Sequence, residues 1–230
     1  MLQQHSALQL VFSADPALYS IVGLSLIVSL GATLFAAMLG APLGALIALS
    51  RFPARQVVVV TLNALMGLPP VVVGLAIYLL LSRAGPLGSL GLLFTPQAMV
   101  ITQTVLVLPI IAALTRQTVE DLWLEYRDEL AAMDVSRWRR VCTLLWDARF
   151  SLVTALLAGF GRAAAEVGSI IIVGGNIEGY TRTMTTTIAL ETSKGNLPFA
   201  LGLGLVLLLV VLLVNVLASL VRHLGARFER

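Results

Sequence analysis

Residues 19–49 read YSIVGLSLIVSLGATLFAAMLGAPLGALIAL, a stretch without a single charged side chain. The uncharged run is slightly longer and extends from Pro16 to Ser50. A helix of roughly 20 apolar residues crosses the hydrocarbon core of a bilayer, in which every backbone polar group must be bonded internally. We therefore predict that this stretch is a transmembrane helix.

The rest of the chain has the same character. Hydrophobic residues make up 58% of the 230 residues and charged residues 12%, well below the charged share of ordinary soluble domains. Four further stretches are long and apolar enough to cross a membrane: 57–81, 96–114, 150–173 and 198–221. The sequence therefore predicts an all-α, polytopic membrane protein with about five transmembrane helices, forming one membrane domain over residues 19–221.

The basic residues indicate how these helices are oriented. If the N-terminus is outside the cell, eleven arginines lie on one side of the membrane, and Arg83, Arg182 and Lys194 lie on the other. Lys and Arg near the ends of spans accumulate on the cytoplasmic side. We therefore expect a periplasmic segment 1–18, a cytoplasmic segment 116–149 and a cytoplasmic tail 222–230.

Two of the predicted spans carry glycine and proline in their interiors. Residues 40–44 read GAPLG, in which the two glycines permit close helix contact and Pro42 predicts a kink. Residues 67–70 read GLPP and predict a bend or a break in the second span. Broken helices often line transport pathways, whereas plain helix packing is the alternative for both motifs.

The segment 116–149 is the longest polar stretch and carries thirteen charged residues. Apolar residues recur in its first half at spacings of four, four and three, which places them on one helix face: Leu122, Tyr126, Leu130 and Met133. Ser136 can then cap a second helix, on which Trp138, Val141 and Leu145 share a face. The pattern predicts a helix, a short turn and another helix, which either lie on the bilayer or dock to a cytoplasmic partner.

Arg162 and Glu166 are charged residues within an otherwise apolar predicted span. Charges at this depth are costly and normally face a bundle interior or a water-filled cavity. At a spacing of four they share one helix face and can neutralise each other. The pair is either a buried staple between helices or part of a transport route.

A polar loop follows the fourth span. Residues 174–176 read GGN, and Arg182 lies among five threonines between positions 181 and 187. Hydroxyls, free backbone N–H groups at a helix start and a guanidinium together suit a doubly charged oxyanion. An ordinary extracytoplasmic loop with threonine caps is the other interpretation.

Residues 128–138 read DELAAMDVSRW and resemble the cytoplasmic loop shared by permeases of type I ATP-binding-cassette importers. The consensus of that loop is Glu-Ala-Ala, three residues, then Gly; here Asp128 takes the place of the glutamate and Asp134 that of the glycine. In the family this loop contacts the ATPase. The resemblance implies ATPase coupling by seven residues: Asp128, Glu129, Ala131, Ala132, Asp134, Ser136 and Trp138.

The second half of the chain carries a closer resemblance. The motifs GFGRAAAEVG at 159–168, GGNI at 174–177, TRTMTTT at 181–187 and ETSKG at 191–195 resemble the permeases of tungstate-type importers, and more loosely those for molybdate and sulfate. The resemblance implies that the chain forms a pathway for an oxyanion, with tungstate as the first candidate. The pathway residues that it implies are Arg162, Glu166, Gly174, Asn176, Arg182, Thr185 and Thr186.

The same resemblance implies the partners and the location of the chain. The expected assembly contains a second copy of the chain, two cytoplasmic ATP-binding subunits and a periplasmic oxyanion-binding protein, in the lipid of a bacterial inner membrane. The net charge of +3 follows from membrane topology and gives no reason to expect nucleic acid.

Other function classes fit the sequence less well. No Gly-x-x-x-x-Gly-Lys-Ser/Thr motif occurs, so the chain is not expected to be an enzyme that hydrolyses ATP. An ion-coupled secondary transporter is the first alternative, although only Arg162 and Glu166 are charged within a span. Cys142 is the only cysteine, and His5 and His223 lie at opposite ends of the chain, so no metal site, cofactor site or catalytic histidine arrangement is expected.

Overall fold

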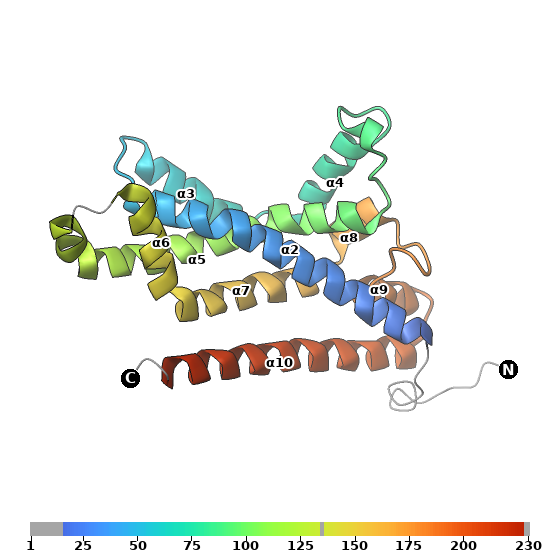
Figure 1. Ribbon diagram of the computed structural model, residues 1–230. Helices are drawn as coiled ribbons and strands as arrows, with labels where there is room; N and C mark the ends of the chain where they lie inside the picture. The colour runs from blue at the N-terminus through green and yellow to red at the C-terminus, as the bar shows by residue number, and fades with distance from the viewer. Residues whose placement is uncertain (1–15, 134–135, 228–230) are drawn as a thin grey trace.

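The computed structural model describes residues 16–133 and 136–227, and all regular structure within these residues is helical (Figure 1). In chain order the elements are α2 (Pro16–Leu49), α3 (Arg55–Leu65), α4 (Pro70–Leu81), the short 3-10 helix η1 (Gly88–Leu90), α5 (Pro96–Ala132), α6 (Arg137–Asp147), α7 (Arg149–Ala164), α8 (Gly168–Gly174), α9 (Met184–Ser193) and α10 (Leu197–Arg227). The predicted all-α class is confirmed.

The long helices form an elongated bundle with two distinct ends (Figure 1). One end carries α6 and the last turns of α5, and we call it the α6 end. The other carries α9 and the first turns of α2, and we call it the α9 end. The helices α3 and α4 project from one side of the bundle as a V-shaped arm.

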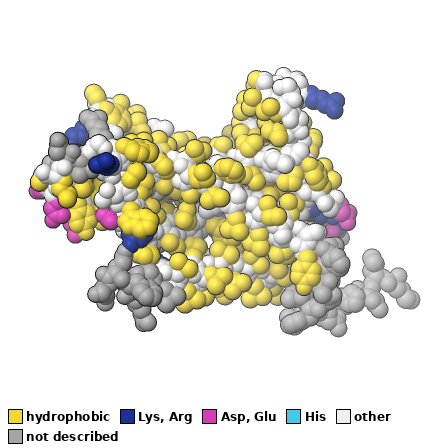
Figure 2. Space-filling model, in the orientation of Figure 1, with side chains coloured by type: hydrophobic (Ala, Val, Ile, Leu, Met, Phe, Trp, Pro, Cys, Tyr) yellow, Lys and Arg dark blue, Asp and Glu magenta, His cyan; other side chains and the backbone are white. Residues whose placement is uncertain are grey.

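Within residues 16–133 and 136–227, three helices contain segments that are long and apolar enough to cross a membrane alone: Leu18–Leu49, Pro96–Leu130 and Leu197–Arg222. Two bent helix pairs raise the number to five if each pair counts as one span: α3 with α4, and α6 with α7. Figure 2 shows hydrophobic side chains over the middle of the molecule and charged side chains gathered toward its ends. Such a surface suits a protein surrounded by lipid.

The helices α2 and α5 make the most extensive contact in the described part of the chain, and glycines permit it. A side chain on Gly44 would overlap the backbone carbonyl of Ala112, and a Cβ on Gly40 would lie 3.1 Å from the carbonyl oxygen of Leu108. The close approach expected from the GAPLG motif is therefore present. The helix α2 continues without interruption through Pro42.

The break predicted at residues 67–70 is confirmed. The axes of α3 and α4 meet at an angle of 98° across this segment. Pro70 occupies the first turn of α4, where its missing N–H has no carbonyl to bond, and Pro69 has the extended conformation of a helix N-cap. The backbone chemistry of the two prolines accounts for the corner of the arm.

The helix α5 is longer than the sequence predicted. The expected span ended at residue 114 and a separate helix was expected after it, but α5 runs unbroken from Pro96 to Ala132. No glycine or proline lies between residues 110 and 132, so nothing in the backbone stops the helix where the apolar stretch ends. The first half of the segment 116–149 is therefore a rigid continuation of a membrane helix.

Candidate translocation and coupling sites

The break between α7 and α8, at residues 165–167, is the centre of the first candidate site. The expectation that Arg162 and Glu166 share the face of one continuous helix is wrong, because α7 ends at Ala164 and Glu166 lies in the break. The two side chains nevertheless form an ion pair, with 2.9 Å between Arg162 Nη1 and Glu166 Oε2. Glu166 is 5% exposed at its side chain and Arg162 32%.

The carboxylate of Glu166 also holds the start of α8. Its Oε1 atom accepts a hydrogen bond of 3.1 Å from the backbone N–H of Ser169. The first N–H groups of a helix have no partner within the helix, and a side-chain acceptor compensates for this. One carboxylate therefore joins the end of α7, through Arg162, to the beginning of α8.

A glutamine from α5 completes the break. Gln103 is buried, and its Nε2 atom donates a hydrogen bond of 2.9 Å to the carbonyl oxygen of Ala163. Its Oε1 atom has no hydrogen-bond partner among the described residues and lines a cavity of about 10 Å³, roughly the size of one water molecule. Gln103 was not singled out from the sequence. An amide side chain within a long apolar span is a signal of a buried polar site and could have identified it.

The threonines before and within α9 are buried and hydrogen-bonded inside the protein. Thr183 and Thr186 form a reciprocal capping box at the start of α9. The hydroxyl of Thr185 donates a hydrogen bond of 2.8 Å to the carbonyl oxygen of Glu166, which ties α9 to the break. In this geometry the predicted pathway residues Thr185 and Thr186 position the centre, and their role in conduction stays a prediction.

The last residue of α8 and the loop after it place three predicted pathway residues at the α9 end. Gly174 is buried against Met99, and a Cβ on it would lie 2.9 Å from the Met99 sulfur. The Oδ1 atom of Asn176 is buried without a hydrogen-bond partner in the described chain. Arg182 pairs with Glu178 at 3.3 Å, while its Nε atom is also buried and unpartnered in the same part of the structure. Glu178 was not singled out from the sequence.

The predicted coupling residues lie at the α6 end. Asp128 and Glu129 are exposed on the last turns of α5, and the side chain of Asp128 is 91% exposed. Ala131 and Ala132 end α5, and Asp134 lies outside the described residues. The predicted cap is confirmed, because the hydroxyl of Ser136 accepts a hydrogen bond of 3.5 Å from the backbone N–H of Arg139 at the start of α6.

A small core fixes the angle between α5 and α6. Leu130 packs with Val141 and Leu144, all three of which are buried. Met133, expected on the same face as Leu130, is 74% exposed, and Trp138 is 61% exposed. The other residues predicted on these two faces pack in the core, whereas the large apolar side chains of Met133 and Trp138 lie on the surface of the α6 end.

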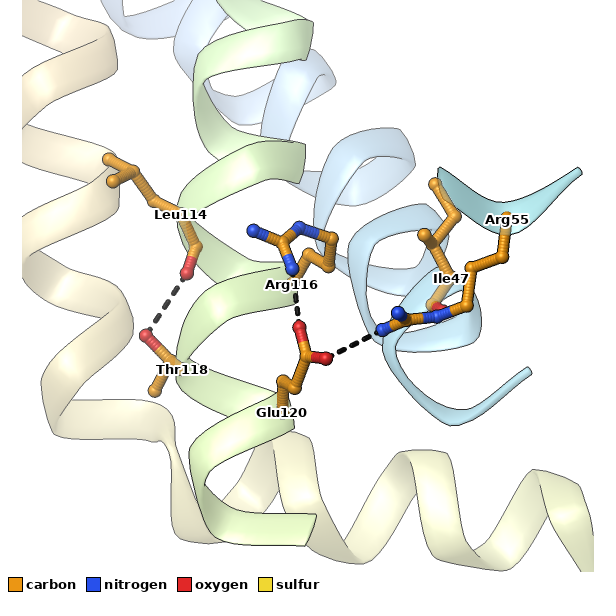
Figure 3. Close-up of polar contacts among 6 residues, drawn as sticks. All are labelled: Ile47, Arg55, Leu114, Arg116, Thr118 and Glu120. Atoms are coloured by element: carbon orange, nitrogen blue, oxygen red, sulfur yellow. Dashed lines mark hydrogen bonds and ion pairs between the residues drawn. The ribbon is translucent and has the colours of Figure 1, made fainter. Parts of the chain in front are cut away.

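An ion-pair network that the sequence analysis missed lies beside this end (Figure 3). The Glu120 carboxylate accepts hydrogen bonds from Arg55 Nη2, at 2.8 Å, and from Arg116 one turn earlier on α5. Arg55 Nε also donates to the carbonyl oxygen of Ile47 at 3.2 Å. The network therefore joins α2, the start of α3 and α5. The Arg116–Glu120 spacing was visible in the sequence, but the distant partner Arg55 was not.

The arrangement is that of a multi-pass transport component, with a broken helix that carries a partly buried charged pair and a helix, α6, that covers one end of the bundle. Residues 40–229 match the family model described as the binding-protein-dependent transport system inner membrane component. The chain belongs to this family and is the inner-membrane permease of an ATP-binding-cassette importer.

Similar proteins are known from an archaeon and from bacteria. The chain is 42% identical to the probable anion ABC transporter permease protein of Haloferax volcanii, over 92% of this chain and 90% of the relative. It is 38% identical to the tungstate uptake system permease protein TupB of Peptoclostridium acidaminophilum, over 91% and 92%. The corresponding protein of Campylobacter jejuni is 36% identical over 91% and 87%.

The family assignment settles several expectations from the sequence. The resemblance to importer permeases is confirmed, and an ion-coupled secondary transporter is no longer a candidate. The chain is a non-catalytic component, as expected, because permeases of this family leave ATP hydrolysis to another subunit. Its partners are, in general terms, an ATPase and a substrate-binding protein.

Proposed function

We propose that the chain forms the translocation pathway of an importer for a doubly charged oxyanion, with tungstate as the first substrate to test. The observation that carries this proposal is the similarity to two tungstate uptake permeases, at 38% and 36% identity, along about nine-tenths of the chain. Molybdate and sulfate have the same charge and a similar shape, and they are the alternatives within the class.

The proposed pathway runs past the break between α7 and α8. Arg162 is the partly exposed member of its ion pair, while Glu166 behind it is buried and balances its charge. A guanidinium offers five N–H donors, so Arg162 can keep Glu166 and still present donors to a passing anion. A partly neutralised arginine holds an anion weakly, which favours release.

At the α9 end, the proposed entrance includes Gly174, Asn176 and Arg182, with Thr185 and Thr186 behind them. Arg182 is again balanced by a carboxylate, that of Glu178, at 3.3 Å. Both arginines of the proposed route are therefore paired with a neighbouring glutamate. Because a glutamate partly neutralises each arginine, this shared arrangement supports weak, transient binding of an anion and not tight binding.

The proposed orientation places the N-terminal segment 1–18 outside the membrane, and the segment 116–149 and the tail 222–230 in the cytoplasm. Eleven arginines against three other basic residues support it. The α6 end then faces the ATPase, and the exposed side chains of Asp128, Glu129 and Trp138 are proposed contacts. Ser136 caps α6, and the alanines 131 and 132 and Asp134 stay proposed coupling residues from the sequence pattern.

The proposed assembly has two copies of this chain and two ATPase subunits. Five spans enclose a route poorly, and the arm formed by α3 and α4 exposes large apolar side chains on both helices, among them Val57, Val60, Val72 and Leu79. A second copy would cover part of this surface.

Movement of the ATPases would shift the α6 end and change the population of open and closed pathways.

The test is uptake by proteoliposomes that contain this chain, its ATPase and its binding protein. Tungstate, molybdate and sulfate are supplied separately, with ATP or a non-hydrolysable analogue inside the vesicles. We expect ATP-dependent uptake of tungstate that exceeds that of sulfate. Uptake of none of the three anions would contradict the proposed substrate class.

A further inference from the structure

A second polar region at the α6 end is not used by the proposed pathway. An open pocket of about 700 Å³ lies where the end of α2, the following turn, the last turns of α5 and the middle of α6 meet. Its basic lining residues are Arg51 from the turn, Arg127 from α5 and Arg140 from α6. Asp128 is the acidic side chain of the lining.

The charges of the pocket are not balanced within the described chain. Arg127 Nε lies 3.4 Å from Asp128 Oδ1, so these two side chains largely compensate each other. Neither Arg51 nor Arg140 makes an ion pair with any described residue. Two positive charges are therefore left without a carboxylate partner among the described residues.

Arg140 is held in place by an aromatic ring. Its guanidinium carbon lies 5.7 Å from the centre of the Trp123 ring, which is a cation–π contact. Its Nε atom is buried and has no hydrogen-bond partner in the described part of the protein. Because unpaired buried donors are costly, this atom would be stabilised by an acceptor that the described residues do not supply.

The apolar part of the lining identifies the chemistry of that partner. Leu46 and Leu49 belong to the uncharged run of α2, and Arg51 is the first charged residue after it. Phe52 and Trp123 also line the pocket, and aromatic residues are frequent at the membrane–water boundary. The lining therefore combines apolar side chains from the uncharged run of α2 with guanidinium groups from the polar residues next to it.

We propose that this pocket binds the phosphate headgroup of an anionic phospholipid, with Arg51 and Arg140 on the phosphate and an acyl chain along Leu46, Leu49 and Phe52. Basic pockets between membrane helices at the cytoplasmic side suit such headgroups. A free phosphate would leave the apolar wall uncovered. A bound headgroup would join the turn after α2 to α6, the helix that carries Trp138. This proposal rests on the proposed function in one respect only, because the orientation of the chain decides which leaflet the α6 end faces.

The test is native mass spectrometry of the purified full chain, released from detergent after incubation with phosphatidylglycerol or phosphatidylcholine. The variants are Arg51→Gln, and Arg51→Gln combined with Arg140→Gln. The control is Arg83→Gln combined with Lys194→Gln, which removes the same charge far from the pocket. Arg51 is exposed, so its single variant is expected to fold normally.

We expect the wild-type chain and the control to retain phosphatidylglycerol over phosphatidylcholine. Each arginine should contribute about fivefold to this preference, so the double variant should lose about twenty-five-fold. Equal retention of both lipids by the wild type, or an unchanged preference in both variants, would overturn the proposal. Displacement of phosphatidylglycerol by inorganic phosphate would assign the pocket to a soluble anion instead. The measurement involves no transport, so its failure leaves the proposed oxyanion import intact.

Discussion

The break between α3 and α4 is made by the backbone, whereas the break between α7 and α8 is held by side chains. Two prolines form the first corner, and its axes turn by 98°. The second break depends on Glu166, which bonds both Arg162 and the N–H of Ser169, and on Gln103, which bonds the carbonyl of Ala163. At residues 69 and 70 the prolines act through their own backbone, whereas the second break also depends on Gln103 of α5, which lies 60 positions from Ala163 in the sequence.

The two breaks also touch each other. A Cβ on Gly74 of α4 would lie 2.7 Å from the Cα atom of Ser169 at the start of α8. A Cβ on Gly168 would lie 2.9 Å from a methyl carbon of Val71. The corner made by the prolines therefore packs directly against the break that side chains hold.

The largest effect is expected from Arg162→Ala. It leaves the buried Glu166 carboxylate without its cation, which should cost about 3 kcal/mol of stability. Glu166→Ala should cost less, because the remaining Arg162 is about one-third exposed. The double variant Arg162→Ala/Glu166→Ala should be more stable than Arg162→Ala alone. Thermal unfolding in detergent measures all three, and equal stability of wild type and both single variants would remove the pair from the account.

A smaller effect is expected where the two breaks meet. Gly74→Ala forces α4 away from Ser169, which should cost about 1–2 kcal/mol, as overpacking does in other cores. Gly23→Ala is the matched control, because a Cβ on Gly23 of α2 meets nothing within 4 Å. The control should be neutral or slightly stabilising, since alanine favours a helix more than glycine. If both variants had the same melting temperature, the close contact between α4 and α8 would be in error.

The anchor of the arm should contribute less. Glu120→Gln weakens its bonds to Arg55 and Arg116, which are partly solvent-exposed, so the loss should be about 1 kcal/mol. Glu125→Gln, the same change at an exposed position of α5, is the control. Spin labels on α3 and α5 would report a wider distribution of distances in Glu120→Gln than in the control. Identical distributions would show that the arm needs no anchor at this point.

The smallest effect is expected from pH at the α9 end. The hydrogen bond from Lys194, and then that from Asn196, hold the pKa of Glu191 below its ordinary value near 4.5. Because the folded state lowers this pKa, the contribution is fully present above about pH 4.5 and is lost as the pH falls through the lowered pKa. The stability difference between wild type and Glu191→Gln should therefore shrink on acidification. A difference that stays constant down to about pH 3 would contradict the assignment.

The comparison of the two breaks also explains what the sequence could predict. The corner at residues 67–70 was predictable, because proline and glycine act through their own backbone. The break at 165–167 was not, since residues 150–173 read as one apolar stretch, and two of the side chains bonded to the break, Gln103 of α5 and Thr185 of α9, come from outside that stretch. Arg162 and Glu166 were identified as a pair, but for the wrong reason, as they were expected on one helix.

At the α6 end, too, the features decided by local chemistry were predictable and the distant contacts were not. The cap by Ser136 follows from local chemistry and was predicted correctly. The helix α5 continues past residue 114, where the apolar stretch ends, because apolar character shows where a helix leaves the membrane and not where the helix stops. The contact between Arg55 and Glu120 joins residues 65 positions apart, and no local pattern identifies such a partner.

The central claim is that the charged break between α7 and α8 serves transport and not only stability. The direct measurement is ATP-dependent tungstate uptake by proteoliposomes containing the Arg162→Ala/Glu166→Ala double variant, after its folding and its assembly with the ATPase have been verified. The account predicts at least about a tenfold loss of uptake, the factor that corresponds to one lost hydrogen bond to a charged group. Uptake at the wild-type rate by the folded, assembled double variant would contradict it.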